Sequence, residues 1–220
     1  MWILVAKKTR TEKPSRRFGW HGHSFVLGTL VLLSISACSG PRVKLPKLSP
    51  AQAGRRAVKQ YDADGNGAIS EDELDNCPGL KVAMVSVDSD GDGRLVAEEI
   101  TDRLEAQRAT GVALASINCF VQLNGKPLAG ASVRFVPEEF LGEGIKVASG
   151  TTGLGGTATM SIAGQEFPGV HCGFYRVEIS KLNANGKETV SAKYNSETIL
   201  GQEVSLRVPE AGIATFSLMH

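Results

Sequence analysis

Two stretches of the chain, DADGNGAISEDE (Asp62–Glu73) and DSDGDGRLVAEE (Asp88–Glu99), share one pattern. Each has acidic or amide residues at its first, third and fifth positions, a glycine sixth and a glutamate twelfth. All the aspartates of the chain lie between Asp62 and Asp102, and residues 50–109 hold 13 acids against 7 bases. Such a concentration is either a solvated acidic surface or an oxygen-rich site for a hard cation. The spacing of the acids decides between the two.

The oxygen-bearing residues have the spacing of a calcium-binding loop. Ca²⁺ takes six to eight oxygen ligands, and a 12-residue loop supplies them from positions 1, 3, 5, 7, 9 and 12. In the first stretch these positions are held by Asp62, Asp64, Asn66, Ala68 through its carbonyl, Ser70 and Glu73. In the second stretch the ligands are Asp88, Asp90, Asp92, Arg94 through its carbonyl, and Glu99. Val96, at position 9 of the second stretch, has no side-chain oxygen, so a water must complete that site.

Both stretches match the pattern D-x-[DN]-x-[DN]-G-x5-E and resemble the calcium loops of EF-hand proteins. Apolar residues flank each loop at helical spacing, and Pro50 after Ser49 predicts the start of the first helix. Only 14 residues, 74–87, separate the loops, so we expect two middle helices of about two turns each. The resemblance implies two Ca²⁺ sites, and the short helices imply that calcium organises this part of the chain. Mg²⁺ is less favoured, because it prefers octahedral sites with several waters.

The N-terminal part of the chain predicts export and a lipid anchor. Residues 1–23 are basic, and an apolar run from Ser24 ends at Cys38. That run is shorter than the roughly 20 apolar residues that a spanning helix needs. Residues 35–38, Ile-Ser-Ala-Cys, resemble the lipobox of bacterial lipoproteins. The resemblance implies a signal peptide over 1–37, a lipidated Cys38 that holds the chain to a membrane of the cell envelope, with the outer membrane favoured, and a tether over 38–48.

The second half of the chain has the sequence pattern of a β-protein. Apolar and polar residues alternate in about seven short runs after Ser116, and Gly- and Asn-rich turns separate them. This pattern predicts an antiparallel β-sandwich. The runs VQLNGKPLAGASVRFVP (Val121–Pro137), FPGVHCGFYRVEIS and AKYNSETIL resemble the transthyretin-like, carboxypeptidase-regulatory-like domains of small bacterial lipoproteins. The resemblance implies a structural or adhesive module and brings no catalytic residues with it.

The cysteines and histidines give little support for catalysis. Cys119 and Cys172 lie on predicted strands, and either a disulfide between them or two buried free thiols is compatible with their spacing. His171 stands next to Cys172, but adjacent residues of a strand point to opposite faces, which argues against a nucleophile–base pair. No phosphate loop and no hydrolase motif of the G-x-S-x-G or H-E-x-x-H kind is present. We therefore expect a protein that is not an enzyme.

Together these patterns predict an α+β chain with two domains. Residues 49–111 are expected to form an EF-hand helix–loop–helix pair, and residues 116–220 a transthyretin-like antiparallel sandwich. The predicted function is calcium binding in a membrane-anchored envelope lipoprotein; the alternative is a calcium-dependent interaction module that docks a surface protein or glycan. Without residues 1–37 the chain has 18 bases and 22 acids, a net charge of −4. Since no basic cluster lies outside residues 1–37, nucleic acid is not an expected partner.

Overall fold

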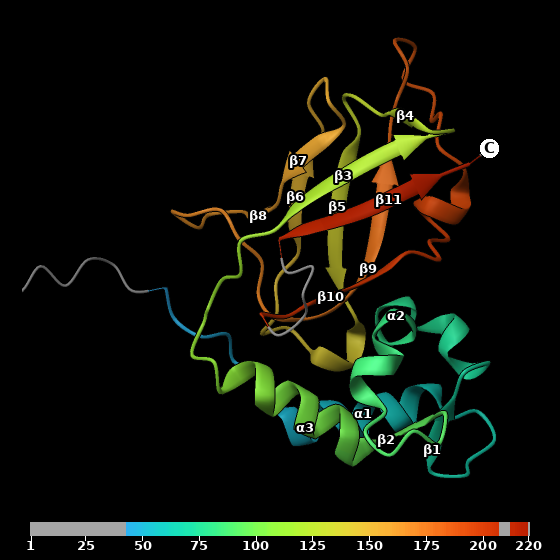
Figure 1. Ribbon diagram of the computed structural model, residues 1–220, viewed down its shortest axis with the longest axis vertical. Helices are drawn as coiled ribbons and strands as arrows, with labels where there is room; N and C mark the ends of the chain where they lie inside the picture. Colours follow the sequence, from blue (N-terminus) through green and yellow to red (C-terminus); the bar gives the residue numbers. More distant parts are fainter. Residues whose placement is uncertain (1–42, 207–211, 220) are drawn as a thin grey trace, which may run out of the picture. The chain divides into compact units, whose positions relative to one another are not determined.

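The computed structural model describes residues 43–206 and 212–219, which form an α+β fold (Figure 1). The predicted signal peptide and Cys38 lie outside the described residues. Within the described part, no helix is both long and apolar enough to cross a membrane. Residues 41–220 form one compact unit, in which the secondary structure changes from helix to strand between Arg108 and Asn118.

The first part of this unit contains three α-helices, two short strands and one turn of 3₁₀-helix. Their bounds are α1 (Pro50–Tyr61), β1 (Ala68–Ser70), η1 (Glu73–Asn76), α2 (Pro78–Val87), β2 (Arg94–Val96) and α3 (Ala97–Arg108). Helices α1 and α3 pack side by side, as Figure 1 shows. Gly54 makes this approach close, because a Cβ at that position would overlap the Ala97 carbonyl and the Thr101 hydroxyl.

The helix boundaries confirm part of the sequence prediction and correct part of it. Helix α1 begins at Pro50, where the missing N–H of proline costs nothing, as expected. However, the Ser49 side chain makes no cap hydrogen bond. The first loop ends in the four-residue η1, which begins at Glu73, instead of leading into a two-turn helix. The reason is that α2 begins at Pro78 and takes ten of the residues between the loops. Because the residue before a proline disfavours helical geometry, the preceding helix must end by Cys77, which leaves η1 a single turn.

The second part of the unit contains two sheets. Its strands are β3 (Asn118–Leu123), β4 (Lys126–Pro127), β5 (Ser132–Pro137), β6 (Ala148–Thr151), β7 (Thr157–Thr159), β8 (Ser161–Ile162), β9 (Gly173–Ser180), β10 (Gly201–Val204) and β11 (Ile213–Leu218). Short 3₁₀ turns occur at η2 (Glu139–Leu141) and η3 (Ala192–Tyr194). One sheet has the order β10-β9-β5-β6-β8; the other has the order β11-β3-β4, with β7 also paired to β3.

One sheet departs from the predicted antiparallel arrangement. Strand β11 pairs with β3 in parallel, from Ile213 opposite Asn118 to Leu218 opposite Leu123. A short hairpin forces antiparallel pairing, but these two strands are separated by most of the second half of the chain, so no turn sets their direction. The other strand pairs of the two sheets are antiparallel, in agreement with the prediction.

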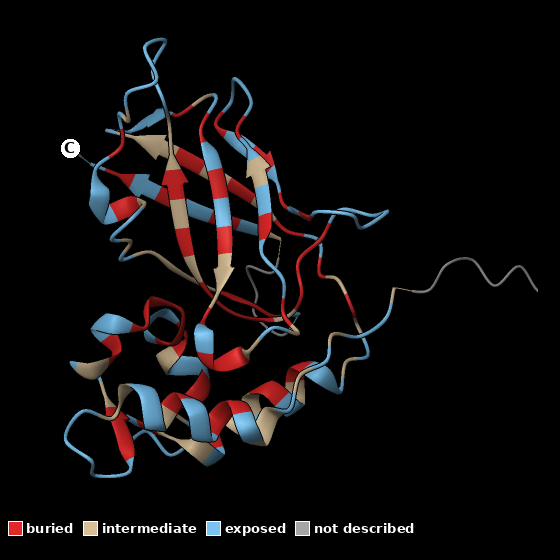
Figure 2. Ribbon diagram, turned by 180° about the vertical axis from the view of Figure 1, so that it is seen from behind, coloured by how far each residue is buried: buried red, intermediate tan, exposed pale blue. Residues whose placement is uncertain are grey.

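The two sheets pack on each other through aromatic side chains. Phe135 on β5 meets Phe216 on β11 edge-to-face, with ring centroids 6.2 Å apart, and lies 5.9 Å from the Tyr175 ring on β9. Buried residues alternate with exposed ones along β11 and with intermediate ones along β9 from Tyr175 onward, and Figure 2 shows this alternation on the strands. The same core continues into the helices through Leu80 on α2 and Leu104 on α3, both fully or almost fully buried.

Helix α2 joins the helical part to the sheets. Gly201 of β10 lies directly against the start of this helix, since a Cβ there would overlap the Pro78 carbonyl. At the same end, the buried Glu138 accepts a hydrogen bond from the Gly79 backbone N–H at 2.8 Å. Because Gly79 belongs to the first turn of α2, the carboxylate also stands at the positive end of the helix. Helix α2 is therefore held by the sheets as well as by η1 and α3.

Candidate metal centre

The two acidic stretches are joined by a two-stranded antiparallel ladder. Below, the first loop is residues 62–73 and the second loop is residues 88–99. Strands β1 and β2 pair antiparallel, with Ile69 opposite Leu95 at the centre. Both side chains are fully buried, so the eighth residue of each loop anchors it to the core. This ladder places the two loops in a fixed mutual position.

In the first loop, Asp62 organises the backbone. Its Oδ1 accepts hydrogen bonds from the N–H groups of Gly65 and Asn66, and its Oδ2 accepts one from Gly67 at 2.8 Å. Gly67 has φ +92°, a left-handed conformation that explains the glycine at the sixth position. An aspartate at the first position thus folds the loop around its own carboxylate.

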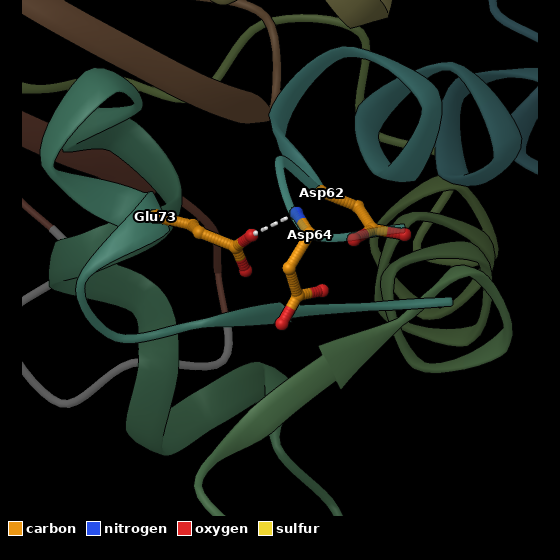
Figure 3. A group of neighbouring side chains, drawn as sticks. All are labelled: Asp62, Asp64 and Glu73. Carbon is orange, nitrogen blue, oxygen red and sulfur yellow. Dashed lines mark hydrogen bonds between the residues drawn. The ribbon is translucent and has the colours of Figure 1, made fainter. Parts of the chain in front are cut away.

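Glu73 closes the first loop from the other side. Its Oε1 accepts from the backbone N–H groups of Ala63 at 2.6 Å and Asp64 at 3.2 Å, the second of which is drawn in Figure 3. Its Oε2 accepts from both the N–H and the hydroxyl of Ser70, each at 2.8 Å. These hydrogen bonds, those from Ser70 foremost, lower the pKa of Glu73 to about 2. The carboxylate is therefore ionised at neutral pH.

The second loop repeats this geometry with one change. Asp88 accepts from the N–H groups of Gly91 at 2.7 Å and Gly93 at 3.0 Å. The buried Glu99 accepts through Oε2 from the Val96 N–H, and through Oε1 from both the N–H and the hydroxyl of Ser89. Ser89 therefore gives Glu99 the hydroxyl contact that Ser70 gives Glu73. Val96 has no side-chain oxygen, as predicted, whereas the contact of Ser89 with Glu99 is not indicated by the loop pattern.

Three carboxylates converge in each loop. Oxygens of Asp62, Asp64 and Glu73 all lie within 4.8 Å of one another, as do those of a second group, Asp88, Asp90 and Glu99. Figure 3 shows the first group, with Asp62 and Asp64 at the end of α1 and Glu73 reaching across from η1. Such a donor set, which consists only of oxygens and carries three negative charges, fits a hard divalent cation.

The remaining predicted ligands have other partners in the structure. The Asn66 amide donates to Asp64 Oδ2 at 2.7 Å, and its Oδ1 accepts from the Ala68 N–H. The Ser70 hydroxyl donates to Glu73, and Asp92, which is not in the second group, accepts from the Arg94 N–H at 2.8 Å. The carbonyl oxygens of Ala68 and Arg94 belong to residues of the β1–β2 ladder, next to these groups.

A cation in the first loop has to compete with the loop's own hydrogen bonds. An ionised carboxylate has about four lone-pair sites, and Glu73 accepts four hydrogen bonds, so all of its sites are used. Ligation by both Glu73 oxygens therefore requires some of these N–H and O–H groups to be released. The affinity of the first loop depends on that exchange as well as on the ligand spacing.

The described cysteines, Cys77, Cys119 and Cys172, are all free thiols. Cys119 lies on β3 with its Sγ 3.4 Å from the Met160 sulfur and 3.6 Å from the Ala158 carbonyl oxygen. Burial raises the pKa of Cys119 to about 11, so this thiol stays protonated and unreactive. The disulfide between Cys119 and Cys172 that the spacing allowed is therefore not formed in this structure.

His171 is a buried structural residue in this fold. Its Nδ1 accepts a hydrogen bond from the Lys146 N–H, and its carbonyl accepts one from the Tyr175 hydroxyl at 2.7 Å. Burial, with a smaller contribution from Lys146, lowers the pKa of His171 below its ordinary 6.5. The folded chain thus binds a proton at this ring less readily than the unfolded chain does.

This pKa shift predicts a pH-dependent stability. Because the unfolded state binds more protons here, the free energy of unfolding is expected to fall as the pH drops below about 6.5. His171→Gln removes the titrating ring, so its stability should decline less between pH 7.5 and 5.5 in calcium-free buffer. Urea unfolding followed by far-UV circular dichroism measures the difference. Parallel profiles for the two proteins would contradict the assignment.

No protein-family model matches the chain, and the comparison with curated proteins found no matching sequence.

Proposed function

We propose that this protein binds calcium through two EF-hand loops, residues 62–73 and 88–99. The observation that carries the proposal is the convergence of three carboxylates in each loop, within 4.8 Å of one another. Support also comes from the β1–β2 ladder, which joins the two helix–loop–helix units into a pair. In this proposal the two sheets that follow form a transthyretin-like module with a structural or adhesive role and no catalysis.

The donor chemistry favours calcium over other cations. Zinc and the later transition metals prefer nitrogen and sulfur ligands, whereas the two groups consist of carboxylates. Magnesium requires near-ideal octahedral geometry and keeps several waters, which suits a site with one or two carboxylates better than one with three. Calcium accepts the larger and less regular oxygen shell that a glycine-rich loop can supply.

Isothermal titration calorimetry tests the proposal directly. The fragment that starts at Ser39 contains the whole compact unit of residues 41–220 and is expected to take up two calcium ions. Glu73→Gln removes a negative charge from the first loop, and Glu99→Gln does the same in the second, so each variant should retain one site. A fragment that gives no heat with millimolar calcium would end the proposal.

The proposal includes the location of the protein. We infer that Cys38 is lipidated and that the chain is anchored to a membrane of the bacterial cell envelope, since the apolar run before Cys38 ends in Ile-Ser-Ala-Cys. Mass spectrometry of the processed chain should show two changes, the loss of residues 1–37 and a lipid on Cys38. An unmodified Cys38 in the mature chain would disprove the anchor without affecting the calcium sites.

A second candidate function is a calcium-dependent interaction module that docks a surface protein or glycan. It is favoured by a groove of about 750 Å³ between α2, β10 and β11, lined in part by the exposed Val82, Val85 and Ile213. Helix α2 leads directly into the second loop, so this wall of the groove is connected to a calcium site. Capture of one defined partner should then require calcium and be lost in Val85→Glu. Equal capture in a chelator would reject this candidate.

A further inference from the structure

A buried carboxylate on the edge strand β10 receives hydrogen bonds from both helices that flank the second loop. Glu203 is 6% exposed, and its Oε1 accepts from Arg103 Nε at 2.7 Å and from Gln107 Nε2 at 2.6 Å. Its Oε2 accepts from the Ser86 hydroxyl at 2.7 Å. Burying a charge is costly unless it is paired and hydrogen-bonded, and Glu203 meets both conditions.

The donors are placed so that their positions depend on the second loop. Ser86 stands in the last turn of α2, two residues before Asp88. On α3, Arg103 and Gln107 follow Glu99 at intervals of four residues, so all three lie on one face of that helix. The loop residues and the donors to Glu203 are thus carried by the same two helices. Ser86 lies at the end of α2 near Asp88, and on α3 Arg103 and Gln107 lie about one and two turns after Glu99.

Helix α2 links the position of the second loop to strand β10, because both ends of the helix contact the second part of the unit. Glu138 accepts from Gly79 at the start of the helix, and Glu203 accepts from Ser86 at its end. The backbone of Gly201, two residues before Glu203, lies against the Pro78 carbonyl. The helix cannot shift along β10 without breaking one of these contacts.

We propose that Glu203 is a positioning residue for the second loop and couples its occupancy to strand β10. The proposal rests on the proposed calcium binding. By accepting from α2 and α3 together, Glu203 fixes the separation of Asp88 and Glu99 before a cation arrives. Less ordering is then needed on binding, so the affinity is higher than the loop residues alone would give. Groups that hydrogen-bond metal ligands directly commonly change metal affinity by about 10- to 100-fold. Glu203 bonds residues next to the ligands, so its effect is expected at the lower end of that range.

Coupling of this kind is reciprocal. If Glu203 raises the affinity of the second loop, filling of that loop must stabilise the contacts of Glu203 by the same factor. Among the described strands, β10 pairs with β9 alone, so its backbone hydrogen bonds open readily unless the contacts with α2 and α3 hold. Calcium is therefore expected to slow amide hydrogen exchange at residues 201–204.

The variant Glu203→Gln tests the proposal in backgrounds that keep one loop at a time. Glu73→Gln isolates the second loop, where Glu203→Gln should weaken calcium binding about tenfold in calorimetry. Glu99→Gln isolates the first loop, where the same change should alter the affinity less than about twofold. The matched control is Glu178→Gln, which removes the same charge from the ion pair of Glu178 with Arg134 on the sheets. It should leave both loops unchanged.

Two further measurements keep the test decisive. Ser86→Ala removes a single donor at an exposed position and should weaken the second loop about threefold, even if Glu203→Gln unfolds. Hydrogen exchange should show that calcium protects β10 in the parent fragment and no longer does so in the Glu203 or Ser86 variant. Equal weakening at both loops, or unchanged affinity at the second loop, would overturn the role of Glu203 while leaving calcium binding intact. If the parent fragment binds no calcium, the proposed function itself fails.

Discussion

Replacing Phe135 by alanine is expected to lower the free energy of unfolding by about 3–5 kcal/mol. The ring is fully buried on β5 and contacts aromatic side chains from both sheets, Tyr175 on β9 and Phe216 on β11. Its removal leaves a cavity at the centre of the contact between the sheets, which neighbouring side chains on rigid strands can fill only in part. Urea unfolding followed by far-UV circular dichroism measures the loss.

The control for this prediction is Phe167→Ala, which removes the same side chain where it is 51% exposed. That variant should differ from the parent by less than about 1 kcal/mol, because it leaves no buried cavity. Since one core runs through the sheets and helices, the Phe135 variant should also unfold in a single transition at lower urea. A loss in Phe135→Ala no larger than that in Phe167→Ala would show that the sheets do not pack through this ring.

Removal of calcium is expected to lower the melting temperature of the fragment from Ser39 by roughly 6–12 °C. At a free calcium concentration ten times the dissociation constant, each filled loop contributes about 1.4 kcal/mol, so two loops contribute about 3 kcal/mol. For a domain of this size, 1 kcal/mol corresponds to about 2–4 °C in melting temperature. Thermal melts with saturating calcium and with a chelator measure the shift directly.

The double variant Glu73→Gln and Glu99→Gln is the control for the calcium effect. It keeps the shape of both side chains but removes one negative charge from each group of carboxylates, so its melting temperature should be nearly the same with calcium and with chelator. Magnesium at the same concentration should give the parent fragment a smaller shift than calcium does. If the parent melts at one temperature under all these conditions, calcium does not stabilise the fold.

The loops could be predicted from the sequence because their signals are local. A glycine at the sixth position, acids at fixed spacing and an apolar residue at the eighth position all act within 12 residues. The structure accordingly brings Asp62, Asp64 and Glu73 together and pairs Ile69 with Leu95. Most alternating runs of the second half likewise became strands, although the run that starts at Glu203 is a strand only as far as Val204. Strands β4 and β6 were not singled out, since each is short and lies next to glycine-rich turns.

What the sequence did not predict depends on contacts between distant residues. Strand β11 pairs in parallel with β3, and α2 packs on β10. Both contacts join segments about 90 to 120 residues apart, and a single sequence does not indicate which distant segments pair. Glu203 stands in an alternating run and was not distinguished from an ordinary surface glutamate, and Arg103 looks like an i, i+4 partner for Glu99. Only the structure shows that Arg103 pairs with Glu203 instead.

The attachment of α2 at both ends limits how the chain between the loops can change. An α-helix turns by about 100° and advances 1.5 Å per residue. An insertion or deletion of one residue inside α2 would therefore keep Gly79 at Glu138 but rotate Ser86 away from Glu203. It would also turn the first residue of the second loop relative to α3. Substitutions at exposed positions such as Val82 leave these contacts in place, so this segment can vary in composition while its length stays constant.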